Sequence, residues 1–434
     1  MDTATATSIA TTPEESVSGP ALLQPLRLRD FRLIFTGESI SLLGDQCHFI
    51  ALAVLALQMT GSGLALGTVL MAAAIPRAVF MVVGGAMSDR VSPRSLMLIS
   101  NALRAVVVAV VALLVLTGNA ELWQLYVLAF IFGVVDAFFH PALNTIVPML
   151  VTERLLPPAN ALVQIIQQLS TLVGPAIAGL VVAAVQTGPA FAIDAASFVV
   201  ATAAIYLVRG GRRIPQHPDT ALPGSPQGES LLATIRTGIG YAWSDPPVRS
   251  LIVLTAAFNF AFTGPIAVGL PVLALENFQG GPAAFGFIIA AFGAGALGGA
   301  ALAGSLRHVP RLGLVTLLIA AGLGIGLALL GNAPNVLLAI AASMAIGLGA
   351  GFINVRVIAW LQARTPEAMR GRVMSLLMLG GVGLAPISLA ISGVIVDLGQ
   401  VALVFSVAGA IVVAAAIAGL YAGVPSQMTD EVEA

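Results

Sequence analysis

The sequence predicts an all-α integral membrane protein with twelve transmembrane helices, arranged as two bundles of six. Three observations support this fold class. The 434 residues are 58% hydrophobic and only 9% charged, with a mean hydropathy of +0.99. Twelve apolar stretches are long enough to cross a bilayer, and one long polar stretch divides them six and six. Because soluble domains carry about 25% charged residues, a chain this poor in charge must be solvated by lipid.

Each apolar stretch can cross the ~30 Å hydrocarbon core at 1.5 Å per residue. Continuous apolar runs indicate helices, because the strands of a membrane barrel would alternate over about 10 residues. The expected spans are residues 31–58, 64–87, 95–117, 122–147, 159–185, 189–208, 249–275, 283–304, 311–331, 335–362, 370–396 and 399–422.

The polar segments between these spans define the expected domain boundaries. The N-terminal tail lacks the basic start and apolar core of a cleavable signal. The linker contains "RGGRRIPQHPDTALPGSPQGES", followed by a stretch over 231–246 that resembles a short interfacial helix. The expected units are a cytoplasmic tail (1–30), a first bundle (31–208), a cytoplasmic linker (209–248), a second bundle (249–422) and a second tail (423–434).

The arginines predict how the chain is oriented. All 19 basic residues are arginine, and 16 lie in the N-terminal segment or in the even-numbered loops. Positive residues collect on the cytoplasmic side of membrane proteins, so we expect both termini inside the cell, in the cytoplasmic membrane of a bacterium. The single cysteine, Cys47, excludes an intramolecular disulfide.

The two halves are weakly similar to each other. "STLVGPAIAGLVV" (170–182) aligns with "GVGLAPISLAISG" (381–393), and Pro175 matches Pro386. Two repeated bundles joined by a cytoplasmic linker suit an alternating-access transporter, in which the bundles rock about a site near the middle of the membrane.

Several motifs together resemble the major facilitator superfamily over the whole chain. "GGAMSDRVSPR" carries Gly85, Asp89, Arg90 and Arg94 at the spacing of that superfamily's signature after span two. Gly174, Pro175 and Gly179 look like a short form of the span-five motif of antiporters. "LPPANALVQ", "FAIDAASF" and "TPEAMRGRVMSL" are similar to the proton-driven drug-efflux branch that includes macrolide-efflux proteins and the enterobactin exporter. The resemblance implies an exporter driven by proton entry.

The signature after span two predicts a gating latch. Asp89 is expected to face the N-terminus of span eleven, whose helix dipole and nearby Arg370 or Arg372 would attract a carboxylate. Gly85 would let the two backbones approach closely. Alternatively, Asp89 and Arg90 only cap a helix and mark topology.

Ionisable residues inside the membrane concentrate in the first half, where each needs a partner or a water-filled cavity. These residues are Glu38, Asp45, His48, Arg77, Arg104, Asp136 and His140. Similar depths predict an ion pair between Glu38 and Arg77, and a looser pair between Asp136 and Arg104.

These pairings leave Asp45 near mid-depth without an arginine. An unpaired carboxyl group in a low-dielectric environment can exchange protons near neutral pH, so Asp45 is the first candidate for proton coupling and Asp136 the second. His48 and His140 share helix faces with these carboxylates and could extend a relay. The alternatives are structural ion pairs for the carboxylates and a hydrogen bond near a helix end for each histidine.

Polar residues in span five and in the second half predict a substrate cavity. Asn160, Gln164, Gln168 and Thr171 share one helix face, and Asn259 and Asn354 are further candidates. Arg77 and Arg104 could bind an anionic cargo if they are unpaired. Interhelical hydrogen bonds are the alternative role for these polar residues.

The expected function is a proton-coupled antiporter that exports drugs or other small, partly apolar molecules. A dedicated exporter of a siderophore or another secreted metabolite is the nearest alternative, followed by an importer, a channel or a membrane sensor. No nucleotide-binding, nucleophile or metal-ligand motif is recognisable, so neither catalysis nor a cofactor is expected. The expected partners are a small-molecule substrate, protons and membrane lipid, without nucleic acid. A single chain suffices for this architecture.

Overall fold

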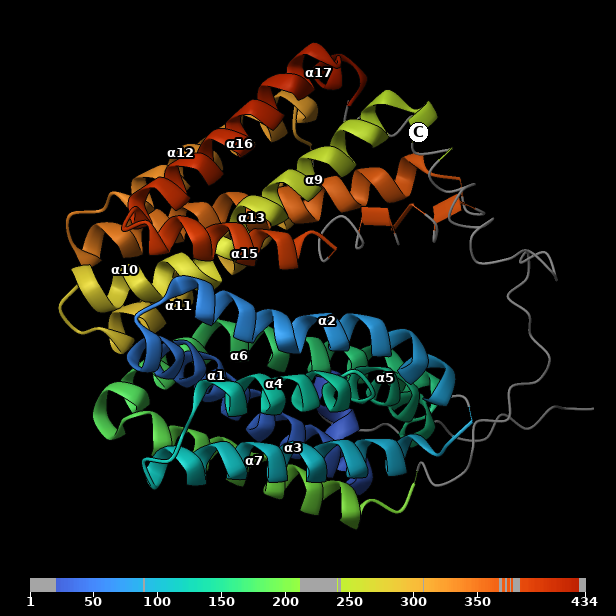
Figure 1. Cartoon of the computed structure of the whole chain (residues 1–434). Helices are drawn as coiled ribbons and strands as arrows, with labels where there is room; N and C mark the ends of the chain where they lie inside the picture. The colour runs from blue at the N-terminus through green and yellow to red at the C-terminus, as the bar shows by residue number, and fades with distance from the viewer. Residues whose placement is uncertain are drawn as a thin grey trace, which may run out of the picture.

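A computed structural model describes residues 21–88, 90–210, 240, 243–306, 308–366, 369–370, 373–374, 376–377 and 383–428 (Figure 1). Within these ranges every regular element is a helix. Eleven of the helical segments are long and apolar enough to cross a membrane. Many large apolar side chains face outward, such as Leu113, Leu318 and Leu337, which are 62 to 73% exposed. A surface of this kind requires lipid around it.

The helices of the first half agree with the expected spans to within a few residues, with one exception. The expected span 122–147 is kinked at Ala137 and Phe138, directly after Asp136, because Pro141 has no N–H group to donate to the Ala137 carbonyl four residues earlier. The elements are η1 (Ala21–Arg27), α1 (Arg29–Thr60), α2 (Gly63–Ser88), α3 (Pro93–Leu116), α4 (Leu122–Asp136), α5 (Phe139–Leu150), η2 (Glu153–Leu155), α6 (Leu156–Val185) and α7 (Thr187–Leu207).

In the second half, too, every described regular element is a helix. The expected span 249–275 contains a π-helical turn that begins at Pro265. The expected span 370–396 lies partly outside the described residues, as does most of the expected interfacial helix over 231–246. The elements are α9 (Pro246–Gly264), η3 (Pro265–Gly269), α10 (Leu270–Asn277), α11 (Pro282–Ser305), α12 (Leu312–Gly331), α13 (Val336–Arg364), α15 (Ala385–Asp397), α16 (Val401–Tyr421) and α17 (Val424–Gln427).

The helices group according to the half of the chain from which they come. Helix α7 packs along α1 and α3, and α13 packs along α11 and α12 (Figure 1). Besides smaller contacts of α1 and α2 with η3, α10 and α11, two main contacts join the halves, α6 with α11 and α2 with α15. Both reach the end of the molecule at which α2 begins and α15 ends, and we call this the closed end. The opposite, linker end carries the hydrogen bond from Arg29 Nη1 to the Leu207 carbonyl (3.2 Å) and the Asp245–Arg364 ion pair (3.0 Å).

Small residues bring the halves into backbone contact near the closed end. A Cβ atom at Gly179 of α6 would lie 2.6 Å from the Pro282 carbonyl oxygen of α11. On the other contact, a Cβ atom at Gly393 of α15 would lie 2.7 Å from the Leu64 Cα atom of α2. Larger side chains at these positions would force the two halves apart, so tight packing here depends on glycine.

A carboxylate of the second half caps a helix of the first half at the closed end. Asp397 accepts hydrogen bonds from the Ser62 hydroxyl (2.7 Å) and from the backbone N–H groups of Gly63 (2.6 Å) and Leu64 (3.3 Å). The first N–H groups of a helix have no partner within it, and the helix dipole favours a negative charge there. We call this contact the cross-half cap.

The cross-half cap is expected to hold the closed end shut. Replacing Asp397 with alanine should cost about 0.5–2 kcal/mol, as is usual for a lost capping side chain, and it removes the described hydrogen bonds that this carboxylate accepts from the start of α2. Val268, fully buried beside Gly67, reports on the seal. In a Cys47→Ala background, a cysteine at position 268 should react faster with a membrane-impermeant thiol reagent when Asp397 is alanine.

Asp245→Ala is the matched control, because Asp245 caps α9 from within its own half. It should lower thermal stability without speeding the labelling at position 268. Equal labelling rates in the two alanine variants would contradict a sealing role for the cross-half cap.

Candidate transport site

Asp136, the last residue of α4, joins three helices of the first half through its carboxylate. Its Oδ2 atom lies 2.9 Å from Arg77 Nε of α2, and its Oδ1 atom lies 3.0 Å from Arg104 Nη1 of α3. The C-terminal end of α4 also carries partial negative charge, which attracts both guanidinium groups. The predicted pair between Asp136 and Arg104 is therefore confirmed, and Arg77 completes what we call the arginine clamp.

Arg104 makes polar and aromatic contacts in addition to its ion pair with Asp136. It donates to the Asn101 side-chain oxygen, and its guanidinium lies 4.2 Å from the ring centre of Phe139 and 4.7 Å from that of Phe198. Arg104 is 2% exposed and Asn101 is fully buried. Burial with a carboxylate, an amide and two aromatic faces fixes both the charge and the orientation of this arginine.

The predicted Glu38–Arg77 ion pair is wrong. Arg77 pairs with Asp136, and the Glu38 carboxylate makes no ion pair or hydrogen bond with any described residue. Glu38 is 7% exposed and lies within electrostatic range of Arg104 and Asp136. Matching depths gave the wrong partner because depth says nothing about the direction in which each side chain leaves its helix.

His48 pairs with a carboxylate that the sequence analysis missed. Its Nδ1 atom lies 3.3 Å from Oδ2 of Asp194, at the centre of α7. Its ring stacks on Phe132 with centroids 4.9 Å apart and meets the edge of Phe191 at 5.3 Å. The signal was available, since Asp194 is the only charged residue in the apolar segment "FAIDAASF".

Asp45 lies on α1 one turn from His48. Its carboxylate makes no ion pair or hydrogen bond with the residues that the structure describes. Among charged neighbours, Asp194 acts on it most strongly, followed by Arg104, Asp136 and Glu38. Among the described residues no arginine forms an ion pair with Asp45, and its charged neighbours include a second carboxylate, Asp194.

A polar recess of about 410 Å³ lies between α1, α5 and α6. The predicted residues Gln164, Thr171 and His140 line it, and four side chains that were not predicted also contribute polar groups: Gln46, Asn144, Gln167 and Ser170. Asn160 and Gln168, also predicted, do not line it. Since His140 lies within electrostatic range of Asp136, the recess approaches the arginine clamp.

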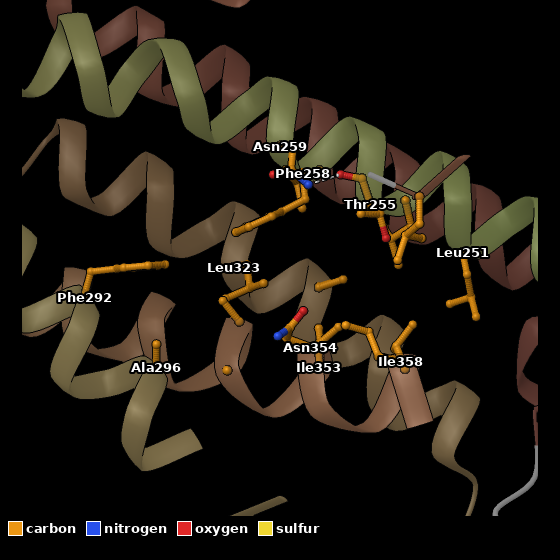
Figure 2. Close-up of a pocket in the computed structure, with 17 residues that line it drawn as sticks. Leu251, Thr255, Phe258, Asn259, Phe292, Ala296, Leu323, Ile353, Asn354 and Ile358 are labelled. Carbon is orange, nitrogen blue, oxygen red and sulfur yellow. Dashed lines mark hydrogen bonds between the residues drawn. The ribbon is translucent and has the colours of Figure 1, made fainter. Parts of the chain in front are cut away.

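A second cavity, of about 290 Å³, lies within the second half between α9, α11, α12 and α13 (Figure 2). Its walls are mostly apolar and include Phe258 and Phe292. The predicted residues Asn259 and Asn354 reach it from different helices. Asn259 donates to the Thr255 carbonyl at 2.9 Å, whereas the Asn354 amide has no hydrogen-bond partner among the described side chains and backbone.

This apolar cavity lies in the linker-end part of the second half. It is lined by residues 251–259, from the first part of α9, and by residues 350–358, from the last part of α13. Asp245, which directly precedes α9, and Arg364, the last residue of α13, form the ion pair at the linker end. Apolar walls with a few polar groups are typical of small-molecule sites, whose volumes start at about 300 Å³.

The residues of the expected latch are only partly described. Asp89 and Arg372 lie outside the described residues. Arg94 donates to the Tyr206 carbonyl of α7 at 2.6 Å, and Arg370 donates to the Gln362 carbonyl at 3.1 Å, so each of these two hydrogen bonds stays within one half. The backbone of Arg90 continues the turn after α2 by donating to the Met87 carbonyl.

The close approach expected at Gly85 was to span eleven, whose first turns lie mostly outside the described residues, so it stays a prediction. A Cβ atom at Gly85 would meet no described atom within 4 Å, whereas one at the preceding Gly84 would lie 2.7 Å from the Ala137 carbonyl oxygen. The close contact is therefore with the kink after α4, inside the first half. Gly84 and Gly85 face different neighbours because successive residues of a helix point about 100° apart.

The span-five motif lies where α6 contacts both halves. A Cβ atom at Gly174 would lie 3.2 Å from Gln46 Cβ of α1, and Gly179 faces Pro282 of α11. The Pro175 carbonyl oxygen faces Gly286 of α11. Within the described ranges, no group of three His, Cys, Asp or Glu side chains could hold a metal ion.

The comparisons with known proteins agree with this geometry. The sequence profile of the transmembrane secretion effector family, a branch of the major facilitator superfamily, matches residues 20–434. The chain belongs to this family and is a membrane transporter of the efflux type.

Two relatives show the range of the family. The chain is 26% identical to macrolide efflux protein A of Streptococcus pyogenes, over 80% of this chain and 84% of that protein. It is 28% identical to the enterobactin exporter EntS of Escherichia coli O1:K1, over 80% of each chain. A solved bacterial homologue of the iron transporter ferroportin, in its inward-facing state, has the same fold, with a TM-score of 0.70 and 17% identity over 91% of this chain and 98% of that one.

The two arginines of the clamp are expected to differ in their effect on stability. Arg104 is buried, and breaking a buried pair costs about 3–5 kcal/mol because an uncompensated charge remains. The Arg77 side chain is 50% exposed, and its loss leaves Asp136 still paired with Arg104, so its share should be smaller. Thermal unfolding in detergent should therefore show a much larger fall in Tm for Arg104→Gln than for Arg77→Gln. Equal falls would contradict this division.

Proposed function

We propose that this transporter is a proton-coupled antiporter that exports drugs or other small, partly apolar molecules by alternating access. One observation carries the proposal. Buried carboxylates and histidines lie in the described first half, whereas the apolar cavity lies in the second half. Proton and cargo can then bind to different bundles and bias the same rocking movement.

The orientation follows from the charge pattern of the loops. The linker end carries Arg29, Arg94, Arg209 and Arg364, and under the positive-inside rule it faces the cytoplasm. The closed end then faces outward. The apolar cavity, near the linker end, would be loaded from the cytoplasm while the cross-half cap and the span-five motif seal the outside. In the opposite state, Asp89 would close the cytoplasmic side against Arg370 or Arg372.

The charge balance favours an apolar cargo. An anionic or catechol cargo would need unpaired cations, and the candidates for that role were Arg77 and Arg104. Both are already paired with Asp136, which balances one of their two positive charges, and Arg104 is buried. The cavity offers instead two phenylalanines, aliphatic walls and two asparagines. We therefore favour a cargo like that of the macrolide efflux relative over one like that of the enterobactin exporter.

Proton coupling is expected to depend on Asp45. In everted vesicles from an efflux-deficient host, adding erythromycin should partly collapse a preset proton gradient, because cargo entry is exchanged for protons. Asp45→Asn, which cannot release a proton, should abolish the response. An intact response in this variant would show that the coupling site is another residue. If the wild type responds to neither erythromycin nor enterobactin, antiport is contradicted and an importer or a sensor is favoured.

The apolar cavity is expected to bind the cargo directly. Phe292→Ala removes an aromatic wall worth about 1.5 kcal/mol, so the Kd for erythromycin should rise about tenfold. Phe130→Ala is the matched control, because Phe130 is 51% exposed on the outer surface of α4. Equilibrium binding to the detergent-solubilised protein measures both. An unchanged Kd in Phe292→Ala would place the cargo outside this cavity.

A further inference from the structure

Asp194 is a carboxylate at the core of the first half without a permanent counter-charge. The residue is 0% exposed, and its Oδ2 atom makes no hydrogen bond, although His48 Nδ1 lies 3.3 Å away. Its Oδ1 atom receives only a long contact from the Ser197 hydroxyl, at 3.4 Å. A carboxylate buried this deeply is costly unless it is paired or neutralised. In the described chain the histidine is its only ion-pair partner.

The contrast with Asp136 shows what this arrangement can do. Asp136 faces two arginines, which stay charged at every physiological pH, so its own charge is fixed. Asp194 faces an imidazole, whose charge depends on one proton. With that proton the pair carries no net charge, and without it the pair carries one negative charge. The pair can therefore bind and release a proton at a buried position.

The surroundings hold the pair in place and set its electrostatic environment. Phe132 and Phe191 fix the imidazole ring from two sides. A Cβ atom at Gly44 would lie 2.7 Å from Asp194 Oδ1, so glycine lets α1 approach α7 at this point. Asp45 and Cys47 of α1 lie within electrostatic range of Asp194, while Glu38 of α1, Arg104 of α3 and Asp136 of α4 lie within range of Asp45.

Access to the pair differs between its two members. The Asp194 side chain is fully enclosed, while that of His48 is 16% exposed. Asp45 is partly exposed and occupies the same face of α1, three residues before His48. A proton that arrives from outside the bundle core therefore meets the partly exposed Asp45 and His48 before it can reach Asp194.

We infer that His48 and Asp194 together form the proton-binding site of the transporter, with Asp45 as the group through which the proton enters and leaves. The inference rests on the proposed antiport and adds a residue and an order of transfer to it. The proton leaves the Asp45 carboxyl group, binds an imidazole nitrogen of His48, and the resulting imidazolium is balanced by the Asp194 carboxylate. Release reverses these steps.

The experiment separates coupling from cargo movement in the same vesicles. Erythromycin-driven proton release is measured in everted vesicles, and exchange of labelled for unlabelled erythromycin is measured without a proton gradient. The variants are Asp194→Asn, His48→Gln and the conservative Asp194→Glu. Glu153→Gln is the matched control, because Glu153 is an exposed carboxylate of η2.

We expect Asp194→Asn and His48→Gln to lose proton release while retaining exchange, and Asp194→Glu to recover part of the release. The control should behave like the wild type. Wild-type release in Asp194→Asn would overturn the inference and leave antiport standing. If Asp194→Asn is not inserted into the membrane, His48→Gln decides, and retained release in that variant overturns the inference. A wild type that exchanges erythromycin without releasing protons would instead defeat the proposed antiport, and the inference with it.

Discussion

The ion triad of Asp136 with Arg77 and Arg104 is the interaction on which the first half depends. It ties α2, α3 and α4 together at the kink after Asp136, in surroundings where any unpaired charge would be costly. The triad engages Arg77 and Arg104, and the other arginines of the described first-half α-helices, Arg29, Arg32 and Arg94, lie within a few residues of a helix start. Among the described residues, Glu38, Asp45 and Asp194 therefore have no arginine as an ion-pair partner. Under the proposed antiport, Asp136 therefore stays charged, whereas Glu38, Asp45 and Asp194 can change charge by binding a proton.

The second half supplies the complementary properties. Its apolar cavity is lined by side chains that carry no charge, and its contacts with the first half run through glycines and the Asp397 cap. Close glycine packing favours discrete arrangements of the two halves over gradual deformation, since backbones in direct contact can separate or stay together but cannot compress. Such a boundary suits two bundles that rock between two states.

The sequence predicted the spans well because hydropathy and helix length are local properties. The kink after Asp136 could have been predicted, because Pro141 has no N–H group to donate to the Ala137 carbonyl, four residues earlier, and its ring crowds that carbonyl. Depth along a helix predicted the Asp136–Arg104 pair but failed for Glu38, because the direction of a side chain around its helix comes only from tertiary packing. Asp194 could have been found from its isolation in an apolar run. The cap by Asp397, 334 residues from Gly63, has no local signal.

The central claim is that the arginine clamp is electrostatically fixed while the first half still binds and releases a proton. Proton release on erythromycin binding tests it most directly, measured with a pH indicator on purified protein in weakly buffered detergent at several pH values. We expect the wild type to release protons, and we expect Arg77→Gln, which removes the exposed guanidinium of the clamp, to show the same pH profile. Binding without any release, or a pH profile displaced by Arg77→Gln, would contradict it.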